Sequence, residues 1–449
     1  MCASGGHLLA AKLQILTRGR WPCQRRNGRR QRLLSLRRGE WPAALKSLMW
    51  GLEMYDPASA CCMTHEAFAP LTIAEYAVQA ALTDQRSDGG SLAFPLLGLF
   101  GETGSLLSEV KKKQRDRTSY RGYAGAVVEE LGDVLWYLAA VASRTGAPLP
   151  GVFAEAVSTT GNDGAITLAA LQPDIMPRAG EPTAAFERTL LKLAGEVGTL
   201  VMETQGQGGE KNIGLLRNRL VTIARTLIQA SNEAGVTLEA AAVKNLAKIS
   251  DRWPRERQYP APLDALADVE ERLPRSIVID IFEREVRGRT YVFQRRNGIN
   301  IGDRLTDNAM TADDYRFHDA FHYAYVAVLG WSPVIRALFR LKRKSAPKVD
   351  EAQDGARAIL IEEGLTTWIF GQALELDLFT GMKPGDLPFD LLKQVRQFAA
   401  GYEAERCPLW LWEEAILQGY VAFRFLREHR RGRLILDLDQ HQMTIEPLS

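Results

Sequence analysis

The sequence predicts a mainly α protein, with a tandem, pseudo-dimeric helical bundle followed by a mostly α C-terminal domain that contains a small β element. Apolar residues recur with helical spacing over residues 71–158, residues 184–253 repeat the same scheme, and strand-like alternation begins only after residue 254. The length of 449 residues fits two or three domains. We divide the chain into a basic extension (1–62), a first repeat (63–158), a linker (159–183), a degenerate second repeat (184–255) and the C-terminal domain (256–449).

The N-terminal segment differs from the rest of the chain in charge. Residues 1–50 contain eleven Lys and Arg but one acid, Glu40, which is typical of a disordered basic extension, with an Arg-rich transit peptide as the alternative. Met63 resembles a natural start. The remainder is mildly acidic and has no apolar run long enough to span a bilayer, so we expect neither a specific nucleic acid nor a membrane as partner. The five scattered cysteines fit a reducing compartment, and we expect a cytoplasmic protein.

The first repeat is predicted to contain four helices. Thr72 can cap "TIAEYAVQAAL", and Pro95 stands near the start of "PLLGLFGETGSLLSEVKKK". "AGAVVEELGDVLWYLAAVASRTG" ends at Gly146, a suitable C-terminal cap, and "LPGVFAEAV" forms the fourth helix. Residues 159–182 contain Gly, Asp and Pro and indicate a linker.

The second repeat echoes the first. "GETGSLLSEV" at 101–110 recurs as "GEVGTLVMET" at 195–204, and "LAAVASRTGAPLPGVFAEAV" at 138–157 recurs as "LIQASNEAGVTLEAAAVKNL" at 227–246. These echoes indicate an internal duplication. Two such helical half-units would pack as a pseudo-dimer and bury each other's apolar faces.

The C-terminal domain begins with a different pattern. "SIVIDIFEREVRGRTYVFQRRNGINIG" alternates and contains Asn297-Gly298, which predicts a short β-hairpin. From about residue 311 to 430 the pattern is helical again, and "GRLILDLDQHQMTIEP" ends the chain with strand-like character.

Two acidic stripes mark the first repeat. Glu130 and Asp133 are three residues apart and share one face of a helix, beside its apolar side. Glu102 and Glu109, seven apart on the preceding helix, also share a face. Carboxylates at the rim of a core repel each other unless a cation intervenes, and Mg²⁺ prefers oxygen ligands and bridges to phosphates. The alternative is that all four are solvated charges on amphipathic helices.

At these residues the chain resembles a family. "GETGSLLSEVKK" and "EELGDVLWYL" are similar to the MazG-like nucleoside triphosphate pyrophosphohydrolases of the all-α NTP pyrophosphatase superfamily, whose signature is an ExxE helix followed by an ExxD helix. The resemblance covers about residues 70–255. It implies an α-helical bundle that cleaves NTPs or dNTPs to the monophosphate and pyrophosphate with Mg²⁺, for which Mn²⁺ is a substitute.

The resemblance implies a ligand set for the first repeat. Glu102 matches the first glutamate of ExxE, and Glu130 and Asp133 match ExxD, all three as metal ligands. Ser105 stands where the family has its second ExxE glutamate, which is a departure. Either Glu109, one helical turn further on, replaces that ligand or water does.

The second repeat departs more strongly. It keeps Glu196 and Glu203, but Arg219 and Thr222 align with the ExxD acids, so we expect one metal cleft per chain. "KNLAKISDRWP" at 244–254 resembles the family's phosphate-binding closing segment, and "KKKQRDR" adds a basic run. The alternative is that these cations are surface charges. The predicted substrate-binding residues are Lys111, Lys112, Asn245, Lys248 and Arg252.

The resemblance also implies a mechanism. Mg²⁺ would clamp the triphosphate and lower the pKa of a bound water, and Glu129 or Glu109 would take the proton of that water. Attack on the α-phosphorus would release pyrophosphate, whose charge Lys or Arg would offset.

The C-terminal domain carries a second candidate metal site. His318 and His322 lie four apart on one helical face, and Glu362 on a later helix could complete a two-histidine, one-carboxylate site. The alternative is a hydrogen-bonded histidine pair in an aromatic core. "RFHDAFH", "KRKS" and "IEE" are similar to segments behind MazG-like domains, to which no activity is attached.

The sequence therefore predicts a nucleoside triphosphate pyrophosphohydrolase with nucleoside triphosphates as partners, and a homo-oligomer is compatible with it. One alternative is a catalytically weakened nucleotide-binding sensor that regulates a metal-dependent C-terminal effector domain. Another places the main chemistry in the C-terminal domain, with the bundle as its regulator.

Overall fold

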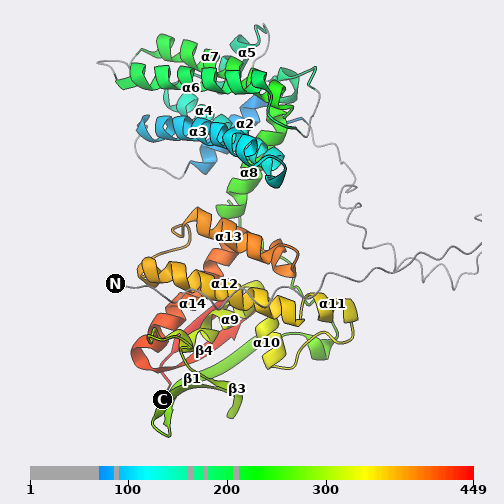
Figure 1. Ribbon diagram of the computed structural model, residues 1–449, viewed down its shortest axis with the longest axis vertical. Helices are drawn as coiled ribbons and strands as arrows, with labels where there is room; N and C mark the ends of the chain where they lie inside the picture. Colours follow the sequence, from blue (N-terminus) through cyan, green and yellow to red (C-terminus); the bar gives the residue numbers. More distant parts are fainter. Residues whose placement is uncertain (1–69, 85–90, 160–164, 176–179, 206–211, 449) are drawn as a thin grey trace, which may run out of the picture. The chain divides into compact units, whose positions relative to one another are not determined.

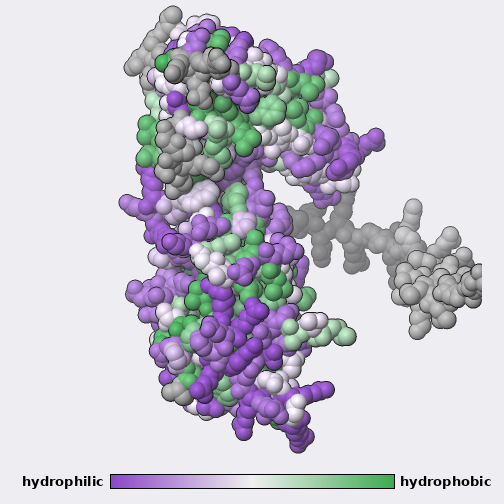
Figure 2. Space-filling view, turned by 90° about the vertical axis from the view of Figure 1, so that its left-hand side faces the viewer, coloured by the Kyte–Doolittle hydropathy of each residue, from purple (hydrophilic) through white to green (hydrophobic). Residues whose placement is uncertain are grey.

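A computed structural model describes residues 70–84, 91–159, 165–175, 180–205 and 212–448 (Figure 1). The basic extension predicted at 1–62 lies outside the described residues. Helices dominate, and one five-stranded antiparallel sheet occurs in the C-terminal part, which confirms the predicted fold class. Among the helices that the structure describes, none combines the length and the apolar character that a membrane crossing requires. On the face shown in Figure 2, hydrophobic residues are interspersed with hydrophilic ones.

The first group of helices has the capping that the sequence predicts. Its members are α2 (Ile73–Thr83), α3 (Ala93–Asp116), α4 (Tyr123–Arg144) and α5 (Leu149–Ala156). The Thr72 hydroxyl accepts from the Glu75 backbone N–H at 3.1 Å, and the Glu75 carboxylate accepts from the Thr72 N–H at 2.9 Å, which forms a capping box. Thr145 caps α4, and Gly146 follows at φ 69°, so the glycine stands one position later than expected.

The second group repeats this order with three helices, α6 (Ala184–Gln205), α7 (Ile213–Ala234) and α8 (Leu238–Arg252). Asn212 and Thr237 cap α7 and α8 with their side chains, and Gly235 ends α7 in the left-handed conformation. The described residues of the predicted linker include local structure, because Thr167 forms a β-bridge with Thr72 and a short 3₁₀ turn, η4 (Ala169–Leu171), follows.

The two groups pack reciprocally. Helix α3 lies against α6 and α4 against α7, while α4 also contacts α8 and α5 contacts α7. Under the sequence echo, α6, α7 and α8 correspond to α3, α4 and α5, so the α4–α8 and α5–α7 contacts are equivalent. One buried core joins them, with Leu131 and Leu138 from α4 and Leu220 and Leu227 from α7. Each half thus covers the other's apolar face, as two related halves would.

The sheet has the strand order β3-β2-β1-β4-β5. Its strands are β1 (Ser276–Val286), β2 (Arg289–Arg296), β3 (Ile299–Leu305), β4 (Arg431–Asp437) and β5 (Gln442–Glu446). The predicted turn at Asn297-Gly298 joins β2 to β3, with φ of 51° and 78°. A second tight turn at Arg287-Gly288 joins β1 to β2, so the single predicted hairpin is part of a three-strand meander. The strands at the chain end complete the sheet by pairing β4 with β1.

Helix α14 runs through the centre of the C-terminal part. It contacts α9, α13, β5 and the π-helical turn η8, and it buries Trp412, Tyr420 and Phe423. The helices here are α9 (Asp319–Ala324), α10 (Pro333–Leu338), α11 (Pro347–Ala352), α12 (Ala356–Glu375), α13 (Phe389–Ala399) and α14 (Leu409–His429). Shorter turns are η2 (Arg117–Ser119), η6 (Val269–Glu271), η7 (Tyr315–Phe317), η8 (Tyr325–Leu329), η9 (Asp377–Phe379) and η10 (Glu403–Arg406). Since α14 also contacts α8, it connects this core to the bundle.

Candidate metal and nucleotide site

Helices α3 and α4 bring three of the predicted acids together. Glu102 of α3 and Glu130 and Asp133 of α4 each offer a carboxylate oxygen, and these oxygens lie within 4.8 Å of one another. The local reason is the amphipathic pattern of α4, which buries residues such as Leu131 and Val134 and leaves the acids half-buried at the rim.

At this rim, burial and the mutual repulsion of the three carboxylates raise the pKa of two of them. Burial and the neighbouring charges of Asp133 and Glu102 raise the pKa of Glu130 to about 7. Burial and Asp133 also raise the pKa of Glu102, although Lys248 and hydrogen bonding by Ser105 partly oppose that shift. The Oε2 atom of Glu130 is buried and has no hydrogen-bond partner among the described residues. An all-oxygen donor set with an unsatisfied buried oxygen fits a hard divalent cation such as Mg²⁺ or Mn²⁺.

Helix α8 carries two of the predicted phosphate ligands to the same place. The Asn245 Nδ2 donates to Asp133 Oδ1 at 2.7 Å, and the Lys248 Nζ lies 2.5 Å from the same oxygen. This contact depends on Gly132, because a Cβ atom there would lie 2.5 Å from the Ala241 carbonyl oxygen of α8. The glycine therefore lets α4 and α8 approach closely enough for these polar contacts to form.

Glu129 occupies a different position from that expected of a proton acceptor. Its carboxylate lies 3.1 Å from the Nζ of Lys393, 3.6 Å from that of Lys248 and 3.8 Å from that of Lys244. Burial works to raise the pKa of Glu129, but these three ammonium groups outweigh it and hold the pKa below its usual value. Glu129 therefore forms ion pairs with the lysines beside the cleft, and its role as the base stays a prediction.

Glu109 lies outside the carboxylate group. It is buried and accepts hydrogen bonds from the Tyr120 hydroxyl and, at 2.5 Å, from Lys112 Nζ. It therefore lies outside the cluster in which a replacement for the ligand missing at Ser105 would be expected, and its role as a base stays a prediction. Lys112 is committed to this pair, and Lys111 is exposed outside the cleft lining, so neither has the predicted place at the site.

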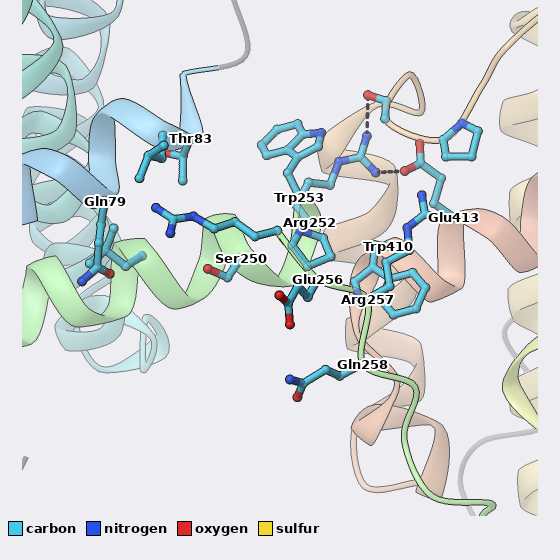
Figure 3. A pocket seen from close by; sticks show the side chains of 16 residues that line it. Gln79, Thr83, Ser250, Arg252, Trp253, Glu256, Arg257, Gln258, Trp410 and Glu413 are labelled. Carbon is cyan, nitrogen blue, oxygen red and sulfur yellow. Dashed lines mark hydrogen bonds and ion pairs between the residues drawn. The ribbon is translucent and has the colours of Figure 1, made fainter.

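Arg252 requires a further correction. Its guanidinium donates to Glu413 of α14 at 2.7 Å and to the Leu387 carbonyl at 2.6 Å, and its side chain is 1% exposed. This arginine lines a cavity of about 650 Å³. Figure 3 shows its side chain beside Trp253, with the guanidinium directed at Glu413. Arg252 thus ties α8 to α14, and it is neither a surface charge nor a phosphate ligand in this arrangement.

The acids face a cleft of about 660 Å³. Three residues that the sequence did not suggest also line it, namely Lys393 and Phe389 of α13 and Trp253 just after α8. The rings of Trp253 and Phe389 stack with centroids 6.5 Å apart, and the Lys393 ammonium lies 4.9 Å from the Phe389 ring. No spacing in the sequence links α13 to α4, because only tertiary packing brings them together. The residues that line the cleft include Glu102, Ser105, Glu130, Asp133, Trp136, Tyr137, Asn245, Lys248, Trp253, Phe389, Asp390 and Lys393.

The predicted histidines also meet, with a different carboxylate. Ligand atoms of His318, Asp319 and His322 lie within 4.8 Å of one another. Glu362 is not in this group, because its Oε1 accepts a hydrogen bond from the other ring nitrogen, His322 Nδ1, at 2.8 Å. Asp319 is therefore the carboxylate beside the two histidines, where the sequence predicted Glu362. Burial works to lower the pKa of His322, but Glu362 and Glu363 outweigh it and raise the pKa to about 10.

The C-terminal part has a recognisable relative. Residues 258–449 match the family model of the MazG C-terminal domain. The match contains the sheet and helices α9 to α14, and it begins after the end of α8. Comparison of the chain with curated proteins and with solved structures gives no match.

The segment similar to the MazG C-terminal domain contributes directly to the candidate site. It supplies Lys393 and Phe389 to the cleft and Glu413 to the buried pair with Arg252. The acid cluster itself belongs to the helices before the match. The cleft is thus formed by the helical bundle and the matched segment together.

Proposed function

We propose that this chain is a divalent-metal-dependent nucleoside triphosphate pyrophosphohydrolase of the MazG type. The observation that carries the proposal is the convergence of Glu102, Glu130 and Asp133, with an unsatisfied buried oxygen on Glu130, in a cleft that also holds Lys248 and Lys393. Acids beside lysines suit a substrate that brings both a cation and phosphates. The match of residues 258–449 to the MazG C-terminal domain supports the same conclusion.

The three acids would hold Mg²⁺ or Mn²⁺. When bound, such an ion would supply positive charge that stabilises the phosphates and lowers the pKa of a water. Ser105 supplies no carboxylate, so water or phosphate oxygens would fill the remaining coordination positions. Asn245 holds one oxygen of Asp133 in place through its 2.7 Å hydrogen bond, which orients this ligand before any ion arrives.

Lys248 and Lys393 would contact the phosphates. In the protein alone they pair with Asp133 and Glu129, respectively, at 2.5 and 3.1 Å, and both line the cleft. Phosphate oxygens are competing acceptors for the same ammonium groups, and the bonds are charge-assisted. Glu129 keeps the lysines at the cleft while the substrate is absent. Trp253 and Phe389 offer aromatic faces for the nucleobase, and such stacking discriminates little between bases.

Release of pyrophosphate from a panel of NTPs, dNTPs and modified nucleotides, with Mg²⁺ or Mn²⁺, tests the proposal. We expect turnover that a chelator abolishes and that Asp133→Asn removes, because this variant loses a metal ligand and the partner of Lys248. Asp174→Asn, which changes an exposed carboxylate outside the cleft lining, should leave turnover unchanged. Equal turnover by wild type and Asp133→Asn would exclude this cleft as the active site.

A nucleotide sensor is the second candidate. Ser105 in the place of an ExxE glutamate and the pairing of Lys248 with Asp133 are the observations that favour it, since both reduce the charge available to a metal ion. The sensor predicts saturable nucleotide binding with no pyrophosphate released at any metal concentration. Turnover that depends on Asp133 would contradict it.

A further inference from the structure

Four metal-ligating side chains gather where η7 and α9 meet α12. The Nε2 of His318 lies 3.2 Å from Asp319 Oδ1 and 3.9 Å from Glu363 Oε2. The Nε2 of His322 lies 3.5 Å from the same Glu363 oxygen. His318 and His322 are four residues apart on one helical face, so both rings reach the same side, with centroids 5.6 Å apart.

Both histidines are held by their other nitrogen. The Nδ1–H of His318 donates to the Tyr315 carbonyl at 2.9 Å, and that of His322 donates to Glu362 at 2.8 Å. Glu362 is itself fixed, because the Ser332 hydroxyl donates to it at 2.6 Å. Because Nδ1 donates in both rings, Nε2 is the nitrogen whose lone pair a metal ion would take once it displaces the proton there, which is the arrangement found in metal-bound histidines.

Asp319 is supported in the same way. Its Oδ2 accepts from the Gln294 amide, whose oxygen in turn accepts from the Tyr323 hydroxyl. With Oδ2 held by Gln294, the other oxygen, Oδ1, faces His318 at 3.2 Å. Three donors are nearly buried, while the Glu363 side chain is 38% exposed and provides the contact with solvent. Each of the three buried ligands is thus held by a hydrogen bond at its other polar atom, His318 to a backbone carbonyl and His322 and Asp319 to side chains.

The Nε2 of His322 is the decisive atom. It is fully buried and makes no hydrogen bond to any residue that the structure describes, since the nearest carboxylate oxygen is too distant at 3.5 Å. We propose that His318, Asp319, His322 and Glu363 form a second metal site, which takes a divalent transition-metal ion through two imidazole nitrogens and two carboxylates. The site does not depend on the proposed hydrolysis and is separate from the acid cleft.

The ligands decide the class of ion. Imidazole nitrogens suit Zn²⁺, Fe²⁺ or Ni²⁺, whereas Mg²⁺ takes oxygen ligands. Ligands at about 2.0–2.2 Å from one ion lie roughly 3–4 Å apart. The atoms of His318, Asp319 and His322 lie within 4.8 Å of one another, and the Glu363 oxygen lies 3.5 and 3.9 Å from the two imidazole nitrogens, so only small movements are needed. An ion there would link η7 and α9 to α12. Binding should therefore stabilise the fold as well as fill the site.

Zinc binding to the full-length chain tests this inference. After removal of metals by a chelator, the wild-type protein should bind about one Zn²⁺ tightly in excess Mg²⁺, and its thermal midpoint should rise. Co²⁺ in place of Zn²⁺ should give visible absorption bands from a nitrogen- and oxygen-ligated ion. His322→Gln and Glu363→Gln should each lose the bands and lower zinc affinity, by a hundredfold or more for the buried ligand. Glu362→Gln, which changes only the residue behind His322, should lower affinity about 10–100-fold.

The controls separate this site from others. His429→Ala removes an exposed histidine elsewhere and should bind zinc as the wild type does. Asp133→Asn should also keep the zinc, and loss of zinc in this variant would place the ion in the acid cleft and overturn the inference. Wild-type protein that binds no zinc, or no more than His322→Gln, would also overturn it. If His322→Gln fails to fold, Glu363→Gln carries the comparison, because its side chain is partly exposed.

Discussion

Helices α4 and α7 correspond in the two halves of the bundle, but they place opposite charges beside the acids of the preceding helix. On α4, Glu130 and Asp133 add negative charge to that of Glu102 on α3. On α7, the aligned residue Arg219 pairs with Glu203 of α6 through two hydrogen bonds of 2.7 and 2.8 Å. The second half thus neutralises Glu203 with its own arginine. The first half has excess negative charge, which an added cation would balance.

The closing helices show the same asymmetry. Asn245 and Lys248 of α8 contact Asp133, but the positions that align with them near the end of α5 are Ala156 and Thr159. The equivalent α5–α7 contact has neither an amide nor an ammonium group at these places. A duplicated unit has therefore kept the acids in one half and the phosphate-binding cations in the other, and the two meet once.

Removal of one acid from each half should have the largest contrast. Glu130→Gln should lower kcat/KM about a thousandfold, because loss of a metal ligand removes several kcal/mol of charge stabilisation in the transition state. Glu203→Gln should leave kcat/KM unchanged, since this acid is already neutralised by Arg219. Steady-state pyrophosphate release measures both. Similar losses in the two variants would mean that both halves bind metal.

Removal of two lysines that pair with acids of different halves gives the next contrast, because Lys248 pairs with Asp133 of the first half and Lys192 with Glu196 of the second. Lys248→Met should lower kcat/KM about 10–100-fold, through loss of a charge-assisted bond worth roughly 1.5–3 kcal/mol. Lys192→Met should have no effect, because this exposed lysine pairs with Glu196 on α6 at 3.6 Å and lies outside the cleft lining. If KM of Lys248→Met rises while kcat stays constant, the lysine acts only in binding. No change in either constant would refute its contact with phosphates.

Local spacing explains which features the sequence could predict. The positions of Glu130 and Asp133 follow from the helical period, and the Asn297-Gly298 turn follows from the φ > 0 that such turns require. The contributions of Lys393 and Phe389 could not be predicted, because they depend on the packing of α13 beside the bundle.

Where a prediction needed a partner from a distant element, it often chose the wrong one. The spacing of His318 and His322 indicated their shared face, but it could not show that Asp319 joins them while Glu362 supports from behind. Arg252 belongs to a segment that resembles a phosphate-binding motif, yet Glu413 on α14 takes its guanidinium. In both cases the deciding contact joins residues far apart in the chain.

The close approach of α4 to α8 can be tested without changing a charge. Gly132→Ala places a methyl group against the Ala241 carbonyl, so we expect a loss of about 1–3 kcal/mol in the free energy of unfolding, with weaker activity as Lys248 moves away. Gly125→Ala on the same helix meets no atom within 4 Å and should instead stabilise by about 0.5–1 kcal/mol. Denaturant unfolding of the two variants gives the comparison. A Gly132→Ala variant that is as stable as Gly125→Ala would show that α4 and α8 are further apart than in this structure.

The smallest expected effect concerns Arg219, the residue that neutralises the second half. Arg219→Gln leaves Glu203 without its ion pair, but Glu203 and Arg219 are both partly exposed, so water can replace the lost bonds. We expect an unchanged thermal midpoint and unchanged pyrophosphate release. The contrasting change is Lys248→Met, which also removes a cation from an acid, yet that acid, Asp133, belongs to the first half and to a cleft with two further carboxylates. A measurable loss of activity in Arg219→Gln would show that the second half contributes to the cleft through its charge. The absence of any effect would confine the metal chemistry to the acids of α3 and α4.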